Sequence, residues 1–158
     1  MKYCYMLKHI NHKNDGNEKL IGFYSSWKKA KNIIKLYRSR LDGFKEQPNS
    51  FVIVEVIINK IYNCNLSRVE QKNLLSEARK NSEHTRISKR KYALWYYYED
   101  DTIEEYAFLG IFESIHIASY IMNRVSGMEN FRGEKNLYLT PEDINESAWE
   151  EGYVTIKV

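Results

Sequence analysis

The sequence predicts an α+β fold made of two ββαβ units, which we name the first and second repeat. One observation is a passage that occurs twice: KLIGFYSSWKKAKNII at 19–34 aligns without a gap with AFLGIFESIHIASYIM at 107–122. The other is that the same order of strand-like and helix-like patterns surrounds both passages. We therefore expect mainly antiparallel sheets with covering helices, and a pseudo-twofold relation between the repeats that comes from an internal duplication.

The first repeat, residues 1–58, has three stretches typical of β-strands. Residues 3–10 alternate between apolar and polar positions. A loop with an Asp-Gly turn signal follows, and then the apolar stretch 19–25, which together predict a hairpin. Residues 51–58, FVIVEVII, are strongly β-branched and favour a third strand.

A helix is expected between the second and third strands of this repeat. Ser25 or Ser26 can accept a hydrogen bond from a free backbone N–H at its start, and Asp42-Gly43 is typical of its end. The apolar residues between these points recur at spacings of 3, 3, 1, 3 and 4, which predicts one apolar face with lysines opposite. The members of this face are Trp27, Ala30, Ile33, Ile34, Tyr37 and Leu41.

The second repeat, residues 92–158, has the same order of elements. Ser114 occupies the position of a helix cap, and apolar residues follow it at the same spacings as in the first repeat. The chain then departs from the first repeat, because a further β-branched stretch, YVTIKV, ends it. The expected strands are 92–98, 105–112, 136–141 and 153–158.

A polar bridge, residues 59–91, joins the two repeats. Ser67 and Glu70 have the spacing of a capping box, in which each residue satisfies a backbone donor of the other. A helix is therefore expected from about 67 to 81, and a basic loop at 82–91. We expect the repeats and the bridge to form one compact body.

The net charge of +3 conceals an uneven distribution along the chain. Residues 1–91 hold 20 Lys and Arg against 8 Asp and Glu, whereas residues 92–158 hold 4 against 13. Such asymmetry bears on partners and on association rates, not on the fold.

The composition indicates a protein of the cytoplasm. Hydrophobic residues make up 43% of the chain, which is enough for a buried core. No apolar run approaches the roughly 18–20 residues that span a bilayer, and no export signal follows Met1. Cys4 and Cys64 are expected to stay reduced. A content rich in Lys, Asn and Ile is typical of a low-GC bacterium or its phage.

Three short motifs carry a family resemblance. They are LIGFYSS with a following Ala at 20–30, GF at 43–44, and WEEGYVT at 149–155. The set resembles a family of small uncharacterised bacterial domains, over 3–58 and more loosely over 92–156. The first repeat lacks the W-x-E-G element, and the second has Asn-Phe where the family has Gly-Phe. The resemblance implies no enzymatic activity, and similar small proteins occur among toxin–immunity and phage-defence genes.

The sequence contains no organised set of catalytic or metal-binding residues. His9 and His12 lie where a strand runs into a loop, without a Cys or carboxylate to complete a metal site, so we expect exposed polar residues. Gly22 and Gly110 each stand alone in a strand, which indicates a close backbone approach, such as that of a strand beneath its covering helix. Cys4 is expected to be a buried, inert thiol. We therefore predict a protein that is not an enzyme and binds no metal or cofactor.

An acidic surface with aromatic neighbours is the favoured binding site. Carboxylates gather around the second hairpin and near the end of the chain, and aromatic residues lead into both. An acidic rim with aromatic anchors is typical of protein interfaces and would steer a cationic partner. We expect a protein-binding role, most specifically an immunity-type inhibitor of a cationic toxin domain. The expected contact residues are Tyr97, Glu99, Asp100, Asp101, Glu104, Trp149, Glu150 and Glu151.

Two alternatives stay open. A cleft between the repeats, with aromatic residues and lysines, could hold a nucleotide or another small molecule, as a phage anti-defence protein would. The basic helix of the first repeat could contact the phosphates of a nucleic acid, although the acidic second repeat ranks this below the other two. The expected anion contacts are Lys28, Lys31, Lys35 and Arg38.

Overall fold

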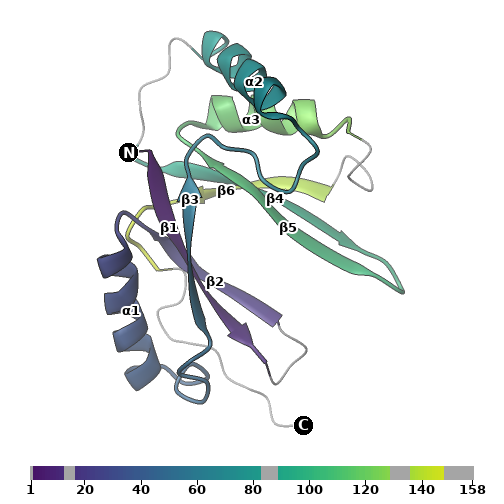
Figure 1. Cartoon of the computed structure of the whole chain (residues 1–158). Helices are drawn as coiled ribbons and strands as arrows, with labels where there is room; N and C mark the ends of the chain where they lie inside the picture. The colour runs from purple at the N-terminus through teal and green to yellow at the C-terminus, as the bar shows by residue number, and fades with distance from the viewer. Residues whose placement is uncertain (1, 13–16, 83–88, 129–135, 148–158) are drawn as a thin grey trace. The chain divides into compact units, whose positions relative to one another are not determined.

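The computed structural model describes residues 2–12, 17–82, 89–128 and 136–147. Within these ranges the chain forms strands and helices in the order ββαβ, α, ββαβ, which confirms the α+β class (Figure 1). The expected strand at 153–158 lies outside the described residues. The elements are β1 (Tyr3–Asn11), β2 (Asn17–Tyr24), α1 (Trp27–Arg40), β3 (Phe51–Ile57), α2 (Arg68–Lys80), β4 (Lys91–Glu99), β5 (Glu104–Phe112), α3 (Ile115–Val125) and β6 (Leu137–Glu142).

The strands form two three-stranded sheets with the same connectivity. Their orders are β2-β1-β3 and β5-β4-β6, so that the first strand of each hairpin is central in its sheet. β1 pairs antiparallel with β2, and β4 pairs antiparallel with both β5 and β6. The two hairpins and the two third strands expected from the sequence are thus present.

Both hairpins carry a register shift at the same place. The shift follows Leu7, which pairs with Gly22, in the first hairpin, and Leu94, which pairs with Gly110, in the second. A β-bulge of this kind adds one residue to one strand and increases the local twist. The two repeated glycines therefore have the same position relative to a bulge.

Serine caps begin the helices at the predicted positions. The hydroxyl oxygen of Ser26 accepts from the N–H of Lys29, and that of Ser114 accepts from the N–H of Ile117. The capping box of Ser67 and its glutamate begins α2 as expected.

The prediction that Trp27 belongs to the buried face of α1 is wrong. Its side chain is 49% exposed. Trp27 is the first residue after the cap, and its ring lies 3.9 Å from the ammonium of Lys31 on the solvent side of the helix. Ala30 and Tyr37 are the buried residues of this helix, whereas Ile33 is half-buried.

The contacts divide the chain into two compact units. Unit 1 consists of residues 1–56 and 144–158, and unit 2 of residues 57–143. The boundaries expected from the repeats were 1–58, 59–91 and 92–158. The two divisions differ because the segment that follows each third strand belongs to the unit of the other repeat.

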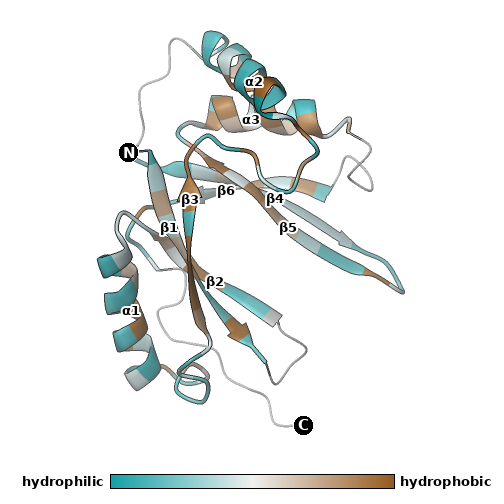
Figure 2. Ribbon diagram, viewed as in Figure 1, coloured by the Kyte–Doolittle hydropathy of each residue, from teal (hydrophilic) through white to brown (hydrophobic). Residues whose placement is uncertain are grey.

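Each unit has its own apolar core, which gains free energy by removing apolar surface from water. In unit 1, α1 lies against β1 and β2, and Figure 2 shows the teal, hydrophilic positions that this helix also carries. The core of unit 1 contains Leu7, Ile21, Tyr24, Ala30, Tyr37 and Phe44. In unit 2, α3 covers the sheet and α2 packs on α3. The core of unit 2 contains Ile61, Leu74, Ala78, Leu94, Tyr96, Leu109, Phe112, Ile117, Ala118, Ile121, Val125 and Leu137.

The charge asymmetry of the sequence does not separate the two units. Unit 1 holds 12 Lys and Arg against 8 Asp and Glu, and unit 2 holds 12 against 13. Because residues 57–91 belong to unit 2 and residues 144–158 to unit 1, positive and negative charges are closer to equal in number within each unit than within residues 1–91 or 92–158. Charge is instead concentrated locally, on α1 and on the hairpin of β4 and β5.

Candidate protein-binding site

One face of the sheet in unit 2 is lined by aromatic rings. Trp95 pairs with Phe108 on β5 and with Tyr138 on β6, and Tyr97 pairs with Tyr106. Paired residues and alternate residues of a strand share one face of a sheet. These five residues therefore lie opposite α3, which covers the other face, and we name them the aromatic face.

The inner rings of the aromatic face are held in place. Trp95 is 3% exposed, and its Nε1 donates to Oγ1 of Thr140 at 2.8 Å. Its ring centroid lies 5.3 Å from that of Tyr106, in a stacked arrangement, and 5.0 Å from that of Phe108, edge to face. Tyr106 is 51% exposed and Tyr138 is 40% exposed. A fixed indole thus supports an outer layer of accessible tyrosine rings.

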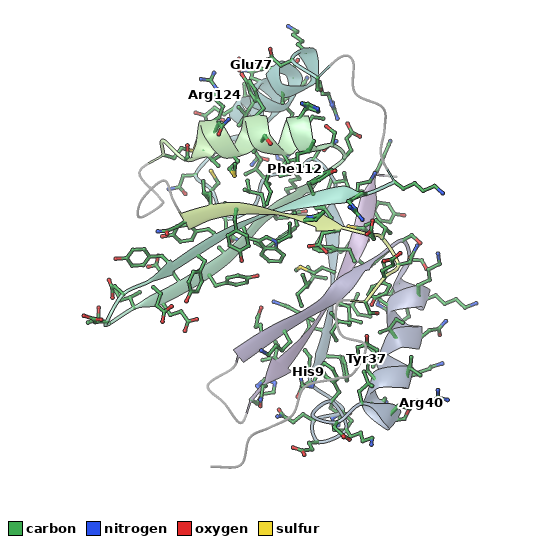
Figure 3. The ribbon with its side chains drawn as sticks, turned by 180° about the vertical axis from the view of Figure 1, so that it is seen from behind. His9, Tyr37, Arg40, Glu77, Phe112 and Arg124 are labelled. Carbon is green, nitrogen blue, oxygen red and sulfur yellow. The ribbon has the colours of Figure 1, made fainter. Side chains whose placement is uncertain are left out.

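Five carboxylates surround the end of this hairpin. We name them the acidic tip: Glu99, Asp100, Asp101, Glu104 and Glu105. No Lys or Arg occurs between 92 and 112, so no cation of the hairpin offsets them. Figure 3 shows the side-chain oxygens gathered there, at the end of the β4–β5 ribbon. The tip therefore carries a local negative potential.

Asp100 holds the turn itself. Its Oδ1 accepts from the backbone N–H and the hydroxyl of Thr102 and from the N–H of Ile103, at 2.8, 2.8 and 2.9 Å. Its Oδ2 accepts from the hydroxyl of Tyr98 at 2.8 Å. These hydrogen bonds, led by the one from the Thr102 backbone, keep the pKa of Asp100 well below its usual range. Asp100 therefore stabilises the conformation of the turn, and its oxygens are already engaged within the hairpin.

Tyr97 connects the aromatic face to the acidic tip. Its hydroxyl donates to the carboxylate of Glu99. This hydrogen bond is the largest cause that raises the pKa of Tyr97 to about 12. The side chains of Asp101 and Glu104 are exposed and form no ion pair within the described part of the chain. Asp101 and Glu104 are thus the tip carboxylates best placed to meet a cation.

Three expected contact residues, Trp149, Glu150 and Glu151, lie outside the described residues. The structure brings together the other five, Tyr97, Glu99, Asp100, Asp101 and Glu104, at one end of a single hairpin. It also adds Tyr106 and Tyr138, which the sequence reasoning missed. The period-two alternation of β4 with its partners contained that signal, because it places Trp95, Tyr106 and Tyr138 on one face.

The cations of α1 form a separate charged surface. All six are exposed, and among the described residues none of them forms an ion pair. Lys29 donates to the hydroxyl of Ser25 at 2.9 Å, and Lys31 lies over the ring of Trp27. The helix contains no acidic residue. The cations are Lys28, Lys29, Lys31, Lys35, Arg38 and Arg40.

A pocket of about 500 Å³ opens beside α1 in unit 1. It is walled mainly by apolar side chains, with one cation, Arg40, and one carboxylate, Glu146. Figure 3 shows Tyr37 and Arg40 on this helix. A single cation opposed by a carboxylate is a poor receptor for phosphate groups. The remaining lining residues are Ile33, Leu36, Tyr37, Leu41 and Ser147.

His9 is a core residue, so the expectation that it is exposed is wrong. Its side chain is fully buried, and its ring contacts the rings of Phe44 and Phe51 edge to face. Nε2 donates to the carbonyl of Gln47 at 3.0 Å, which places the proton of the neutral ring on Nε2. Burial lowers the pKa of His9. Among the described residues no group of three His, Cys, Asp or Glu side chains could hold a metal ion, and Cys4 is buried as predicted.

No family model, curated protein or solved structure matches the chain. The resemblance carried by the LIGFYSS and W-x-E-G motifs therefore stays a prediction. Within the described ranges, no helix has the length and apolar character needed to cross a membrane.

Proposed function

We propose that the chain is a non-enzymatic binding protein whose aromatic face and acidic tip receive a cationic partner protein. The observation that carries the proposal is their junction: the hydroxyl of Tyr97, on the aromatic face, donates to Glu99, at the tip. The most specific form of this role is an immunity-type inhibitor that neutralises a cationic toxin domain.

The two parts of the surface would contribute in different ways. Exposed rings such as Tyr106 attract Lys and Arg side chains through their π faces and provide apolar contact area. Exposed carboxylates contribute little affinity singly, but together they accelerate the encounter with a cationic partner and select against anionic ones. The indole of Trp95 keeps the rings in place, which limits the entropy lost on binding.

The test begins with the partner captured by crosslinking in cells that express the chain. The purified partner is then titrated against the wild type, Asp101→Lys, Glu104→Lys and Tyr106→Ala. We expect each charge reversal to weaken binding roughly tenfold or more, mainly through a slower association rate that loses its dependence on salt. Tyr106→Ala should raise the dissociation rate instead.

Glu46→Lys is the matched control, because it makes the same charge change on an exposed residue of unit 1. Its affinity should equal that of the wild type. If Asp101→Lys and Glu46→Lys bind the partner equally well, the acidic tip is not the binding site. For the immunity role, co-expression with the toxin must protect cells, and Asp101→Lys must reduce that protection.

A second candidate function is nucleic-acid binding through α1. It is favoured by the six cations of this helix, which form no ion pair with the residues that the structure describes. Four of them form a row at spacings of 3, 4 and 3: Lys28, Lys31, Lys35 and Arg38. Four phosphate contacts on duplex DNA would give a slope of about −3.6 in a plot of log affinity against log salt concentration. The double variant Lys31→Gln/Lys35→Gln should halve that slope, whereas Lys72→Gln/Lys80→Gln on α2 should not. Affinity that is equal for both double variants would reject this candidate.

We also propose that the two repeats are copies of one ancestral ββαβ unit. The equal strand orders of the two sheets, the register shifts beside Gly22 and Gly110, and the serine caps of α1 and α3 support this proposal.

A further inference from the structure

Two asparagines occupy the same place after the third strand of each repeat. Asn59 follows β3 by two residues and Asn145 follows β6 by three. Both have positive φ, 63° and 74°, in the left-handed region that asparagine tolerates better than most residues. Each chain segment therefore turns at an asparagine as it leaves its sheet.

Asn145 binds the strand–helix junction of the first repeat. Its N–H donates to the carbonyl of Phe23 at 2.8 Å. Its Oδ1 accepts from the N–H and from the hydroxyl of Ser25, both at 2.9 Å. A residue of the second repeat thus satisfies the backbone between β2 and α1.

Asn59 makes the same contacts with the second repeat. Its N–H donates to the carbonyl of Ile111 at 2.8 Å, and its Oδ1 accepts from the N–H of Glu113 at 3.1 Å. Ile111 and Glu113 are the residues that align with Phe23 and Ser25 in the doubled passage. Equivalent backbone atoms of the two repeats are therefore bound in the same way, each by the segment that follows the third strand of the other repeat.

The repeated glycines leave space for these segments. A Cβ on Gly22 would lie closer than 3.0 Å to the carbonyl oxygen of Glu146, and a Cβ on Gly110 equally close to that of Lys60. The carbonyls belong to the residues that follow the two asparagines. The close approach expected at these glycines is thus made by the exchanged segment and not by the covering helix.

One further pair of equivalent positions is polar in unit 1 and apolar in unit 2. The hydroxyl of Tyr24 lies 2.6 Å from Oγ of Ser147 in unit 1. The equivalent residues of unit 2 are Phe112, labelled in Figure 3, and Ile61, which both belong to its apolar core. Two polar residues in unit 1 thus correspond to two residues of the apolar core in unit 2.

We propose that these are two copies of one peptide-binding site, each occupied by the segment that follows the third strand of the other repeat. The ligand is a turn with a left-handed asparagine and a carbonyl that packs against glycine. The two repeats are therefore reciprocal partners, and they hold each other even where the chain between them is broken.

The test uses the full chain with a protease recognition sequence inserted directly after Ser82, cut after folding. We expect the cut halves to elute together from size-exclusion chromatography, at the volume of the uncut protein, and to separate only in urea. Halves that separate in buffer alone would overturn the proposal.

The α2–α3 contact also spans the cut, because Glu77 of α2 accepts from Tyr120 and pairs with Arg124 of α3 at 3.2 Å (Figure 3). Two variants of the cut chain separate its role from that of the exchanged segment. Asn145→Gly keeps the backbone turn and removes only the side-chain acceptor, and Glu77→Gln weakens only the helix contact. Asn145→Gly should lower the urea concentration of separation clearly more than Glu77→Gln does. Equal values for Asn145→Gly and the unaltered cut chain would overturn the proposal.

Discussion

At the scale of single residues, burial of His9 couples the stability of unit 1 to pH. The ring is neutral in the folded state, where it donates to Gln47 and packs between Phe44 and Phe51. Burial lowers its pKa, the hydrogen bond to Gln47 opposes that effect in part, and the nearby His12 adds to it. The folded pKa is thus below the value of about 6.5 of the unfolded chain.

We therefore predict that His9 makes unfolding easier in acid. Above the unfolded pKa its contribution to stability is complete. As the pH falls below about 6.5 the unfolded state binds a proton that the folded state resists, so stability is lost until the lower folded pKa is passed. Urea unfolding at pH 7.5 and pH 5.5 measures this loss. His9→Phe should reduce it, whereas the exposed His116→Gln should not; an unchanged loss in His9→Phe would refute the assignment.

At the scale of elements, the β4–β5 turn depends on one of its aspartates. Asp100 accepts from Thr102, Ile103 and Tyr98, whereas the side chain of Asp101 is exposed. We predict that Asp100→Ala lowers the melting temperature and that Asp101→Ala leaves it nearly unchanged. Because the pKa of Asp100 is lowered on folding, the difference between the two variants should shrink as the pH falls below about 3.9. Equal melting temperatures at pH 7 would contradict this role of Asp100.

The cations in the first turn of α1 oppose the stability of their own helix. Lys28 lies in the first turn, where the positive end of the helix dipole disfavours a cation. We predict that Lys28→Glu stabilises the protein by about 0.5 kcal/mol, measured as the free energy of unfolding in urea. Arg38→Glu makes the same charge change in the last turn, where the dipole has the opposite sign, and should not stabilise. Stabilisation by both variants to the same extent would show general charge repulsion instead.

Local elements were predictable from the sequence because their signals are local. Alternation, β-branched runs and serine caps placed the strands and helices within a few residues of their observed ends. The prediction that Trp27 is buried was wrong because a residue directly after a helix cap can turn toward solvent while it keeps the apolar spacing. The prediction that His9 is exposed was wrong because its hydrogen-bond partner, the carbonyl of Gln47, lies far along the chain and carries no sequence signal.

At the scale of the whole molecule, sequence patterns could not predict which repeat the segment after each third strand contacts. The doubled passage predicted two repeats, but Asn59 and Asn145 lie outside it, at different offsets from the aligned residues. Their contacts join the segment that follows one third strand to the strand–helix junction of the other repeat, and they depend on tertiary structure alone. The same exchange explains why the charge asymmetry of the sequence does not become an asymmetry of the two compact units.

The most direct test of this reciprocal arrangement is amide hydrogen exchange by NMR, because the N–H groups of Ser25 and Glu113 each donate to an asparagine in the segment that follows the third strand of the other repeat. In Asn145→Gly, exchange at Ser25 should accelerate while Glu113 stays protected. In Asn59→Gly the pattern should reverse. If Asn145→Gly leaves the amide of Ser25 protected, or Asn59→Gly leaves the amide of Glu113 protected, the two repeats do not complete one another.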